Sequence, residues 1–251
     1  MMITGGSSGI GKATAELFAN KGYKVYELSR HGENREGILH IDCDVTKPGD
    51  CQRAVALVME AEGHLDVLIS NAGMGISGAV EFTDEADWKR QMDVNFNGAV
   101  NITQAALPCL RQTAQQQTFR PRIIFVSSMM ANFAIPFQAF YTASKFAING
   151  FALALKNELR PFGVEVCCLM PGDVKTGFTD ARKDNVAGKV NDERYVAMSA
   201  VYENEQATLK VEIAALQQEI EAQSTQAENL DRFIQTIRRY DELDHLTPYA
   251  A

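Results

Sequence analysis

Long apolar runs are absent from this chain of 251 residues. None approaches the roughly 18 consecutive residues that a membrane-spanning helix requires, which argues against an integral membrane protein. Residues 1–5 also lack a basic segment followed by a long apolar one, so we expect no secretory signal and a cytoplasmic location.

The chain also lacks the cysteine spacings of a metal site. None of its five cysteines belongs to a Cys-x-x-Cys pair with a neighbouring histidine pattern. We expect them to be small apolar side chains in a reducing compartment, with neither disulfides nor a bound metal.

The chain has fewer positively charged residues than negatively charged ones. The chain has 24 Lys and Arg against 32 Asp and Glu, a net charge of −8, which argues against broad nucleic-acid binding. Residues 201–251 alone carry 4 Lys and Arg against 10 Asp and Glu, so most of the excess negative charge lies there. The remaining composition, 46% hydrophobic and 22% charged, suits one soluble α/β domain with an appendage.

Short β-rich runs alternate with amphipathic helical stretches up to about residue 178. This alternation predicts a Rossmann-like, doubly wound parallel sheet, with ligands at the carboxyl ends of its strands. The expected strands are 1–4, 24–29, 38–42, 67–70, 122–127 and 165–170. The expected helices are 9–20, one beginning at Pro48, 84–111 after an N-cap at Thr83 and with an interruption at Gly98 and Pro108, and 140–160.

After residue 178 no further strand is expected, and we expect residues 203–243 to form one long polar helix. Apolar residues recur there at alternating spacings of four and three, which indicates a helical hairpin or coiled coil. The seam contains Leu209, Ile213, Leu216, Ile220, Gln223, Ala227, Leu230, Ile234 and Ile237. We therefore divide the chain into a domain of residues 1–180, a linker of residues 181–200 and a heptad tail of residues 201–251.

A glycine-rich turn joins the first expected strand to the first helix. Glycines allow a tight turn there and let a pyrophosphate approach the free N–H groups of the helix N-terminus. A solvated Gly/Ser surface turn is the alternative. The residues of the turn are Thr4, Gly5, Gly6, Ser7, Ser8, Gly9, Ile10 and Gly11.

The end of the second expected strand bears on the choice of dinucleotide. An acidic residue there would hold the adenosine ribose and select NAD(H), whereas Ser29 leaves room for a 2′-phosphate that Arg30 can pair with. We therefore expect NADP(H). Arg30 could instead be a solvated side chain, and a shift in register that brought Glu27 to the acidic position would restore NAD(H).

Tyr141 and Lys145 are four residues apart on an expected helix and therefore share a face. A phenol is a poor base at neutral pH, but a nearby ammonium stabilises the phenolate and allows proton exchange with an alcohol or carbonyl. Ser128, at the end of the fifth expected strand, can donate a hydrogen bond to the same oxygen. A core tyrosine beside a solvated lysine is the alternative.

Together these motifs resemble the short-chain dehydrogenase/reductase family over residues 1–180. Gly5, Gly9 and Gly11 match its TGxxxGxG turn, and Ser128, Tyr141 and Lys145 match its catalytic serine and Tyr-x-x-x-Lys pair. The resemblance implies that Asn95 completes the catalytic set through a water-linked relay to Lys145, which would also hold the nicotinamide ribose. It implies a homodimer or tetramer and these further cofactor-binding residues: Asp44, Val45, Asn71, Ala72, Gly73, Pro171, Gly172, Val174 and Thr176.

Apolar residues flank the expected catalytic group and suggest a small lipophilic ketone or secondary alcohol as substrate, unless they simply pack the core. They are Met74, Ile76, Met129, Met130, Phe133, Ile135, Phe137 and Phe140. The leading hypothesis is an NADP(H)-dependent oxidoreductase. The alternative is a truncated or fused dinucleotide-binding protein with little turnover whose tail mediates association. A 3-oxoacyl-carrier-protein reductase has less support, because an acidic carrier would need a basic surface.

Three features depart from the family pattern. The first strand is several residues short, so we expect it to be frayed. The helix and seventh strand that normally follow the Pro171–Gly172 loop are not found in the sequence. The tail from Leu230 to Pro248 resembles the C-terminal end of large serine recombinases, without their catalytic domain.

Overall fold

The computed structural model describes residues 1–116, 119–172, 174 and 183–184, and seven separate residues between 208 and 218. The chain divides into two units, Met1–Lys189 and Val190–Ala251. In the second unit the described residues are all helical: Thr208, Val211, Glu212, Ala214, Ala215, Leu216 and Gln218. The rest of the predicted tail, including most of the heptad seam and the residues that resemble a recombinase, lies outside the described residues.

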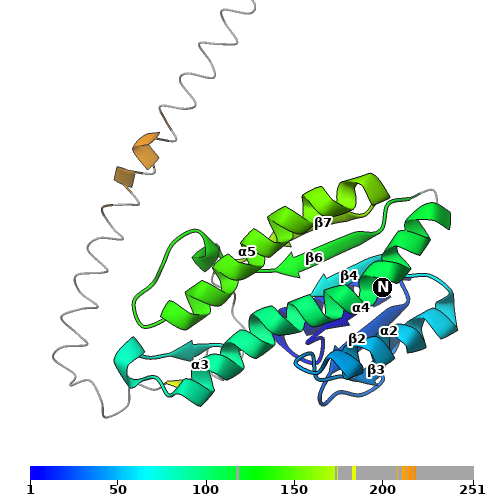
Figure 1. Ribbon diagram of the computed structural model, residues 1–251, viewed down its shortest axis with the longest axis horizontal. Helices are drawn as coiled ribbons and strands as arrows, with labels where there is room; N and C mark the ends of the chain where they lie inside the picture. The colour runs from blue at the N-terminus through cyan, green and yellow to red at the C-terminus, as the bar shows by residue number, and fades with distance from the viewer. Residues whose placement is uncertain are drawn as a thin grey trace, which may run out of the picture. The chain divides into compact units, whose positions relative to one another are not determined.

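A parallel sheet of six strands forms the first unit, in the order β3-β2-β1-β4-β6-β7 (Figure 1). All six predicted strands are confirmed to within one residue at each end. The strand order reverses between β1 and β4, which makes the sheet doubly wound. The strands are β1 (Met2–Thr4), β2 (Val25–Ser29), β3 (Ile38–Asp42), β4 (Val67–Ser70), β6 (Arg122–Val126) and β7 (Glu165–Leu169).

Five α-helices connect the strands: α1 (Gly9–Asn20), α2 (Pro48–Glu62), α3 (Glu85–Met92), α4 (Gly98–Gln116) and α5 (Ala139–Leu159). As predicted, α2 has Pro48 at its first position, where a missing N–H costs no hydrogen bond. Short 3-10 turns complete the connections at η1 (Val80–Phe82), η3 (Met129–Ala131) and η4 (Arg160–Phe162).

The predicted interruption at Gly98 in the helix over residues 84–111 is confirmed, whereas the predicted N-cap and the expected break at Pro108 are wrong. Asp84, not Thr83, is the N-cap of α3, and a π-helical segment, η2 (Asp93–Asn97), separates α3 from α4. Pro108 lies inside α4 without ending it. The proline removes one hydrogen bond, but the buried side chains of Ala106 and Leu110 on either side hold the helix in place.

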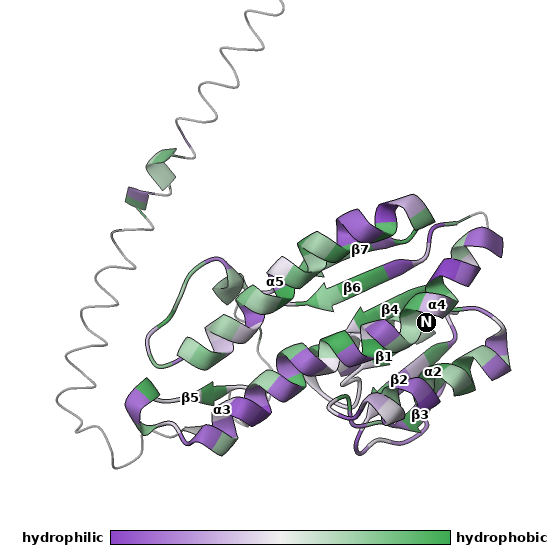
Figure 2. Cartoon of the chain, viewed as in Figure 1, coloured by the Kyte–Doolittle hydropathy of each residue, from purple (hydrophilic) through white to green (hydrophobic). Residues whose placement is uncertain are grey.

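The core has two parts, one on each face of the sheet. Helices α2, α4 and α5 cover one face over a cluster that includes Leu68 and Phe125, both fully buried. Helix α1 covers the other face over a smaller cluster around Ile3. Figure 2 shows β4 and β6 as hydrophobic along most of their length and α3 as mainly hydrophilic. Among the described residues, no helix is both long and apolar enough to cross a membrane.

Two predictions about strands need correction. The short β1 is not frayed, because all three of its residues are fully buried and it pairs with β2 on one side and β4 on the other. A strand also occurs after residue 178, because β8 (Lys183–Asp184) pairs in parallel with β5 (Ile76–Ser77) in a separate small sheet. Two-residue strands have too few residues to show an alternating pattern, which explains the omission.

Candidate functional site

The predicted site residues gather at the carboxyl ends of the central strands. In Figure 1 the arrowheads of β4 and β6 point toward the end of the sheet where α5 begins. This edge includes the point between β1 and β4 where the strand order reverses, which is the usual ligand-binding position of such sheets.

The glycine-rich turn between β1 and α1 has the geometry that an anion requires. Gly5 and Gly9 adopt positive φ angles of 65° and 53°, and a Cβ on Gly11 would lie 2.2 Å from the Gly5 carbonyl oxygen. Ser8, the N-cap of α1, makes no side-chain capping bond, and the first turn contains no acidic residue. The N–H groups of this turn therefore remain available to a phosphate.

Thr4 and Asn71 join the ends of β1 and β4. The Thr4 hydroxyl oxygen accepts the N–H groups of Asn71 and Ala72 at 2.9 and 3.0 Å. The Asn71 amide donates in return to the carbonyl oxygens of Thr4 and Gly5 at 2.9 and 3.2 Å. The predicted Asn71-Ala72-Gly73 segment is thereby fixed against the glycine-rich turn.

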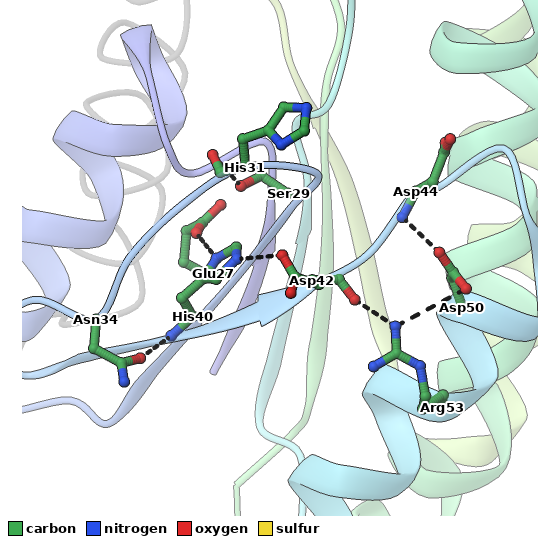
Figure 3. A network of polar contacts seen from close by, with 9 residues as sticks. All are labelled: Glu27, Ser29, His31, Asn34, His40, Asp42, Asp44, Asp50 and Arg53. Atoms are coloured by element: carbon green, nitrogen blue, oxygen red, sulfur yellow. Dashed lines mark hydrogen bonds and ion pairs between the residues drawn. The ribbon is translucent and has the colours of Figure 1, made fainter.

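Asp44 follows β3 and is held by polar contacts on both sides. Its Oδ1 accepts the backbone N–H and the hydroxyl of Thr46, and its own N–H donates to Asp50 (Figure 3). Burial by itself would raise the pKa of Asp44, but the Thr46 hydrogen bonds and the charges of Arg30 and Lys47 lower it overall. The side chain is therefore a fixed carboxylate that lies within the electrostatic influence of Arg30.

The neighbouring predicted residues lie around Asp44. The carbonyl of Val45 accepts the Asn101 amide at 2.9 Å, and Ser29 at the end of β2 donates to the carbonyl of His31 at 3.2 Å. Arg30 is exposed. Glu27, the acidic alternative, is fully buried and contacts His40 at 2.6 Å. The last residue of β2 is Ser29, not Glu27.

Lys145 is buried beside Tyr141 on α5. Its Nζ donates to the carbonyl of Val126 at 3.0 Å and lies 5.6 Å from the centroid of the Tyr141 ring. A Cβ on Gly73 would be 3.7 Å from this Nζ. Burial lowers the pKa of Lys145 to about 8. The lysine is therefore not the solvated side chain of the alternative interpretation.

Asn95 lies in the π-helical turn η2 and is only 2% exposed. Its Oδ1 accepts the N–H of Met74 at 2.8 Å, and its Nδ2 donates to the Met74 carbonyl and the Ser144 hydroxyl at 2.9 and 3.0 Å. A Cβ on Gly73 would be 3.4 Å from the Asn95 Oδ1, so Asn95 and Lys145 border the same glycine. Such π-turns are frequent at functional sites.

Ser128 is the N-cap of η3, two residues after β6, and its Oγ accepts the N–H of Met130 at 3.2 Å. The next residue, Met129, donates its N–H to the Pro171 carbonyl at 3.1 Å, and a Cβ on Gly172 would lie 3.0 Å from the Met129 sulfur. The loops after β6 and β7 therefore meet. Val174 is exposed, and Thr176 lies outside the described residues.

The predicted substrate-facing residues differ in exposure. Met129 and Phe133 are 45% and 41% exposed, whereas Ile76 is buried in β5. Phe137 has a φ angle of 64°, which is strained for a bulky residue, and its carbonyl accepts the N–H of Gly78 at 2.8 Å. The partly buried members are Met74, Met130, Ile135, Phe137 and Phe140.

Sequence reasoning missed two residues that support the site. Ser144 bonds to Asn95, and only its place one residue before Lys145 hinted at this. The Arg35 guanidinium bonds to the Gly6 carbonyl of the glycine-rich turn and to Glu16, both at 2.9 Å, and no sequence signal indicated it. Within the described part of the chain, no group of three or more acidic, histidine or cysteine side chains is arranged to hold a metal.

Known proteins share both the sequence and the fold of this region. The family model described as short chain dehydrogenase matches residues 1–187. A 3-ketodihydrosphingosine reductase from Bacteroides thetaiotaomicron is 44% identical over 183 residues, which cover 72% of this chain and 66% of the relative. The chain thus spans just under two-thirds of that relative's length.

Solved structures agree with this match. A 3-ketoacyl-(acyl-carrier-protein) reductase from Brucella melitensis, complexed with NADH, is 28% identical with a TM-score of 0.68, covering 72% of this chain and 78% of that one. ElxO, with NADP bound, is 26% identical with a TM-score of 0.65, covering 70% and 73%. With the glycine-rich turn, the Tyr141–Lys145 pair and the six-stranded sheet, these matches show that the chain belongs to the short-chain dehydrogenase family of oxidoreductases.

Proposed function

We propose that this protein transfers a hydride between NADP(H) and a hydrophobic ketone or secondary alcohol, with Tyr141 as the general acid and base. The observation that carries the proposal is the buried Lys145 amine, 5.6 Å from the centroid of the Tyr141 ring at the end of β6. Lys145 has no acidic partner among the described residues, and a buried lysine without one is costly and is seldom kept for packing alone.

The residues at this edge fit a dinucleotide. The glycine-rich turn leaves the N–H groups of α1 without a side-chain cap, which suits a pyrophosphate. Asp44 and Val45 would line the adenine, Gly73 would lie along the cofactor, and Pro171, Gly172 and Val174 would meet the nicotinamide end. The nicotinamide, when bound, supplies or accepts the hydride.

The protein's own residues would handle the proton. The positive charge of Lys145 stabilises the phenolate of Tyr141, so the phenol can give a proton to a developing alkoxide or take one from an alcohol. Ser128 would donate a hydrogen bond to the same oxygen. Asn95, fixed by three hydrogen bonds, would link the amine of Lys145 to solvent through a bound water.

The surroundings of Tyr141 favour a lipophilic substrate. Met129 and Phe133 present exposed apolar side chains on the segment after β6, close to Ser128 in the sequence. The Bacteroides relative is named as a reductase of 3-ketodihydrosphingosine, a ketone on a sphingoid chain. We therefore place a ketone with a long apolar substituent first among the substrates to test.

NADP(H) is the proposed cofactor because Ser29 is small and Arg30 is exposed beside it. A guanidinium pairs well with a 2′-phosphate, and no acidic side chain of β2 projects to the surface there. The related structures carry either NADH or NADP, so the preference depends on this chain's own residues.

The test is turnover of hydrophobic ketones, followed by the loss of NADPH absorbance, in wild type and in Tyr141→Phe. We expect the variant to lose at least about 100-fold in kcat, because the proton donor is removed, while NADPH affinity changes less than about twofold. Tyr23→Phe, at an exposed tyrosine just after the C-terminal end of α1, is the matched control and should retain full activity. Equal turnover in wild type and Tyr141→Phe would refute the assignment.

Self-association through the tail of residues 201–251 is a second proposed function. Leu216, a member of the predicted heptad seam, is helical and 57% exposed, as an unpaired coiled-coil position would be. Deletion of residues 201–251 should lower the number of subunits in the assembly, which light scattering measures through the molecular mass. An unchanged number of subunits would refute association through this tail.

A further inference from the structure

A charged cluster of Glu27, His40 and Asp42 lies on β2 and β3 beneath the proposed phosphate site, with Glu27 buried and Asp42 exposed. Glu27 of β2 and His40 of β3 are neighbours in the sheet register, and Glu27 is 0% exposed. The His40 Nδ1 lies 2.6 Å from the Glu27 Oε2, and its Nε2 lies 3.0 Å from the Asp42 Oδ1 (Figure 3). The Glu27 Oε1 is buried and has no hydrogen-bond partner among the described residues.

The hydrogen-bond geometry around His40 favours its protonated form. A neutral imidazole has one N–H, so it can donate to only one of the two carboxylates that face its nitrogens. Only the imidazolium, which has two N–H groups, can donate a hydrogen bond to both carboxylates. Burial by itself lowers the pKa of His40, but the hydrogen bonds and charges of Asp42 and Glu27 outweigh it and raise the pKa overall.

The cluster supports the loop that carries Ser29 and Arg30. Gly32 of this loop lies directly against it, since a Cβ there would be 2.5 Å from the His40 Nδ1 and 2.7 Å from the Glu27 Oε2. On the other side, a Cβ on Gly6 of the glycine-rich turn would be 2.4 Å from the Glu27 Cγ. The two segments proposed to hold the cofactor's adenosine end therefore rest on one carboxylate–imidazole pair.

We propose that Glu27 and His40 are positioning residues that make the discrimination between NADPH and NADH depend on pH. When His40 is protonated, its positive charge balances the negative charge of Glu27, and the loop holds Ser29 and Arg30 in place for a 2′-phosphate. With His40 neutral, a buried carboxylate loses its cation, the loop loses its support, and the charge beside the 2′-phosphate becomes more negative. The inference rests on the proposed dinucleotide site.

Other charged groups surround the pair but belong to separate contacts. On α1, Glu16 pairs with Arg35 and Lys12. On α2, Arg53 donates to the Asp42 carbonyl at 2.5 Å and lies 3.9 Å from Asp50. The loop between β2 and β3 adds Arg30, His31, Glu33 and Glu36, all exposed. His31 is the exposed histidine of this loop, so its replacement supplies the matched control.

The experiment measures the Kd of NADPH and of NADH by nicotinamide fluorescence between about pH 7 and pH 9. The 2′-phosphate itself titrates near pH 6, so it contributes little in this range. In wild type we expect the ratio of the NADPH Kd to the NADH Kd to rise about tenfold across the range. Lys145, whose pKa is about 8, would hold the nicotinamide ribose that both cofactors share, so its titration cancels in this ratio. His40→Gln should bind NADPH weakly at every pH, whereas the matched control His31→Gln should keep the wild-type slope.

Glu27→Gln is the second variant. It keeps the shape of the side chain but removes the buried charge that favours the imidazolium, so the loss of NADPH affinity should begin at lower pH than in wild type. A Kd ratio independent of pH in wild type overturns the inference. So does a pH dependence of this ratio that is retained in His40→Gln, or one that begins at the same pH in Glu27→Gln as in wild type. If wild type binds NADH but its ratio of Kd values does not change with pH, this inference fails and the proposed function stands. If wild type binds neither cofactor, the inference and the proposed function both fail.

Discussion

Replacing Lys145 by methionine should stabilise the fold at neutral pH while abolishing activity. Burial lowers the pKa of Lys145 from its ordinary 10.5 to about 8. This difference corresponds to about 3 kcal/mol by which the folded state disfavours the charged amine. Methionine has a similar length and no charge, and its introduction leaves the Val126 carbonyl without its donor, at a cost of about 1 kcal/mol. We therefore expect Lys145→Met to be about 2 kcal/mol more stable than wild type at pH 7.

The sign of this effect reverses with pH. Because the pKa of Lys145 is lower in the folded chain, the unfolded chain binds more protons between about pH 8 and pH 10.5, and wild type gains stability across that window. The variant has no such gain. Above about pH 10 the neutral amine keeps its hydrogen bond in wild type, so the variant should become the less stable protein.

Urea denaturation at pH 7 and at about pH 10, followed by the fluorescence of Trp88 and by far-UV circular dichroism, measures both differences. Other groups that titrate in alkali are shared by the two proteins and cancel in the comparison. Lys156→Met, at an exposed position on the same helix, should change stability by less than about 0.5 kcal/mol at either pH. A Lys145→Met variant less stable than wild type at pH 7, or a difference independent of pH, would refute the reasoning.

Three further substitutions test the framework of the site. Gly11→Ala places a Cβ 2.2 Å from the Gly5 carbonyl oxygen, so we expect a loss of at least about tenfold in NADPH affinity, measured by fluorescence titration. Asn95→Ala removes three hydrogen bonds in a buried position and should lower the free energy of unfolding by about 2–4 kcal/mol; a loss of kcat without any loss of stability would contradict this account. Thr4→Val leaves the N–H groups of Asn71 and Ala72 without an acceptor and should cost about 2–4 kcal/mol in urea denaturation, whereas Thr4→Ser, which keeps the hydroxyl, should lose less than about half of that.

The burial of Lys145 illustrates a conflict between stability and activity, because the amine that the proposed reaction needs is costly to keep in the interior. The same desolvation that costs stability lowers the pKa of Lys145 and excludes water from the charge that we propose acts on Tyr141. An apolar side chain at position 145 would avoid this cost in stability but would also remove the amine that the proposed reaction requires. A gain in stability on losing Lys145 is therefore the expected signature of a functional residue.

The sequence by itself determined the architecture of residues 1–170. The strands were readable because buried parallel strands are short apolar runs between turn residues, and these patterns are local. The Tyr141–Lys145 pair was equally accessible, because residues four apart on a helix are always neighbours. The N-cap near Thr83 and the break at Pro108 were predicted wrongly. The interruption at Gly98 was predicted but its π-helical form was not, since a π-turn leaves no local signature in the sequence.

Only the tertiary structure decided which distant residues support the site. Asn95 meets Ser144 across 49 residues, and Arg35 meets the glycine-rich turn across 29, through contacts that no periodicity encodes. The sequence presented Glu27 as a rival for the ribose position, but the register of β2 and β3 places it in the interior against His40. Burial and pairing depend on the packing of whole elements, so the charge states of Lys145 and His40 could be inferred only once the strands were assembled.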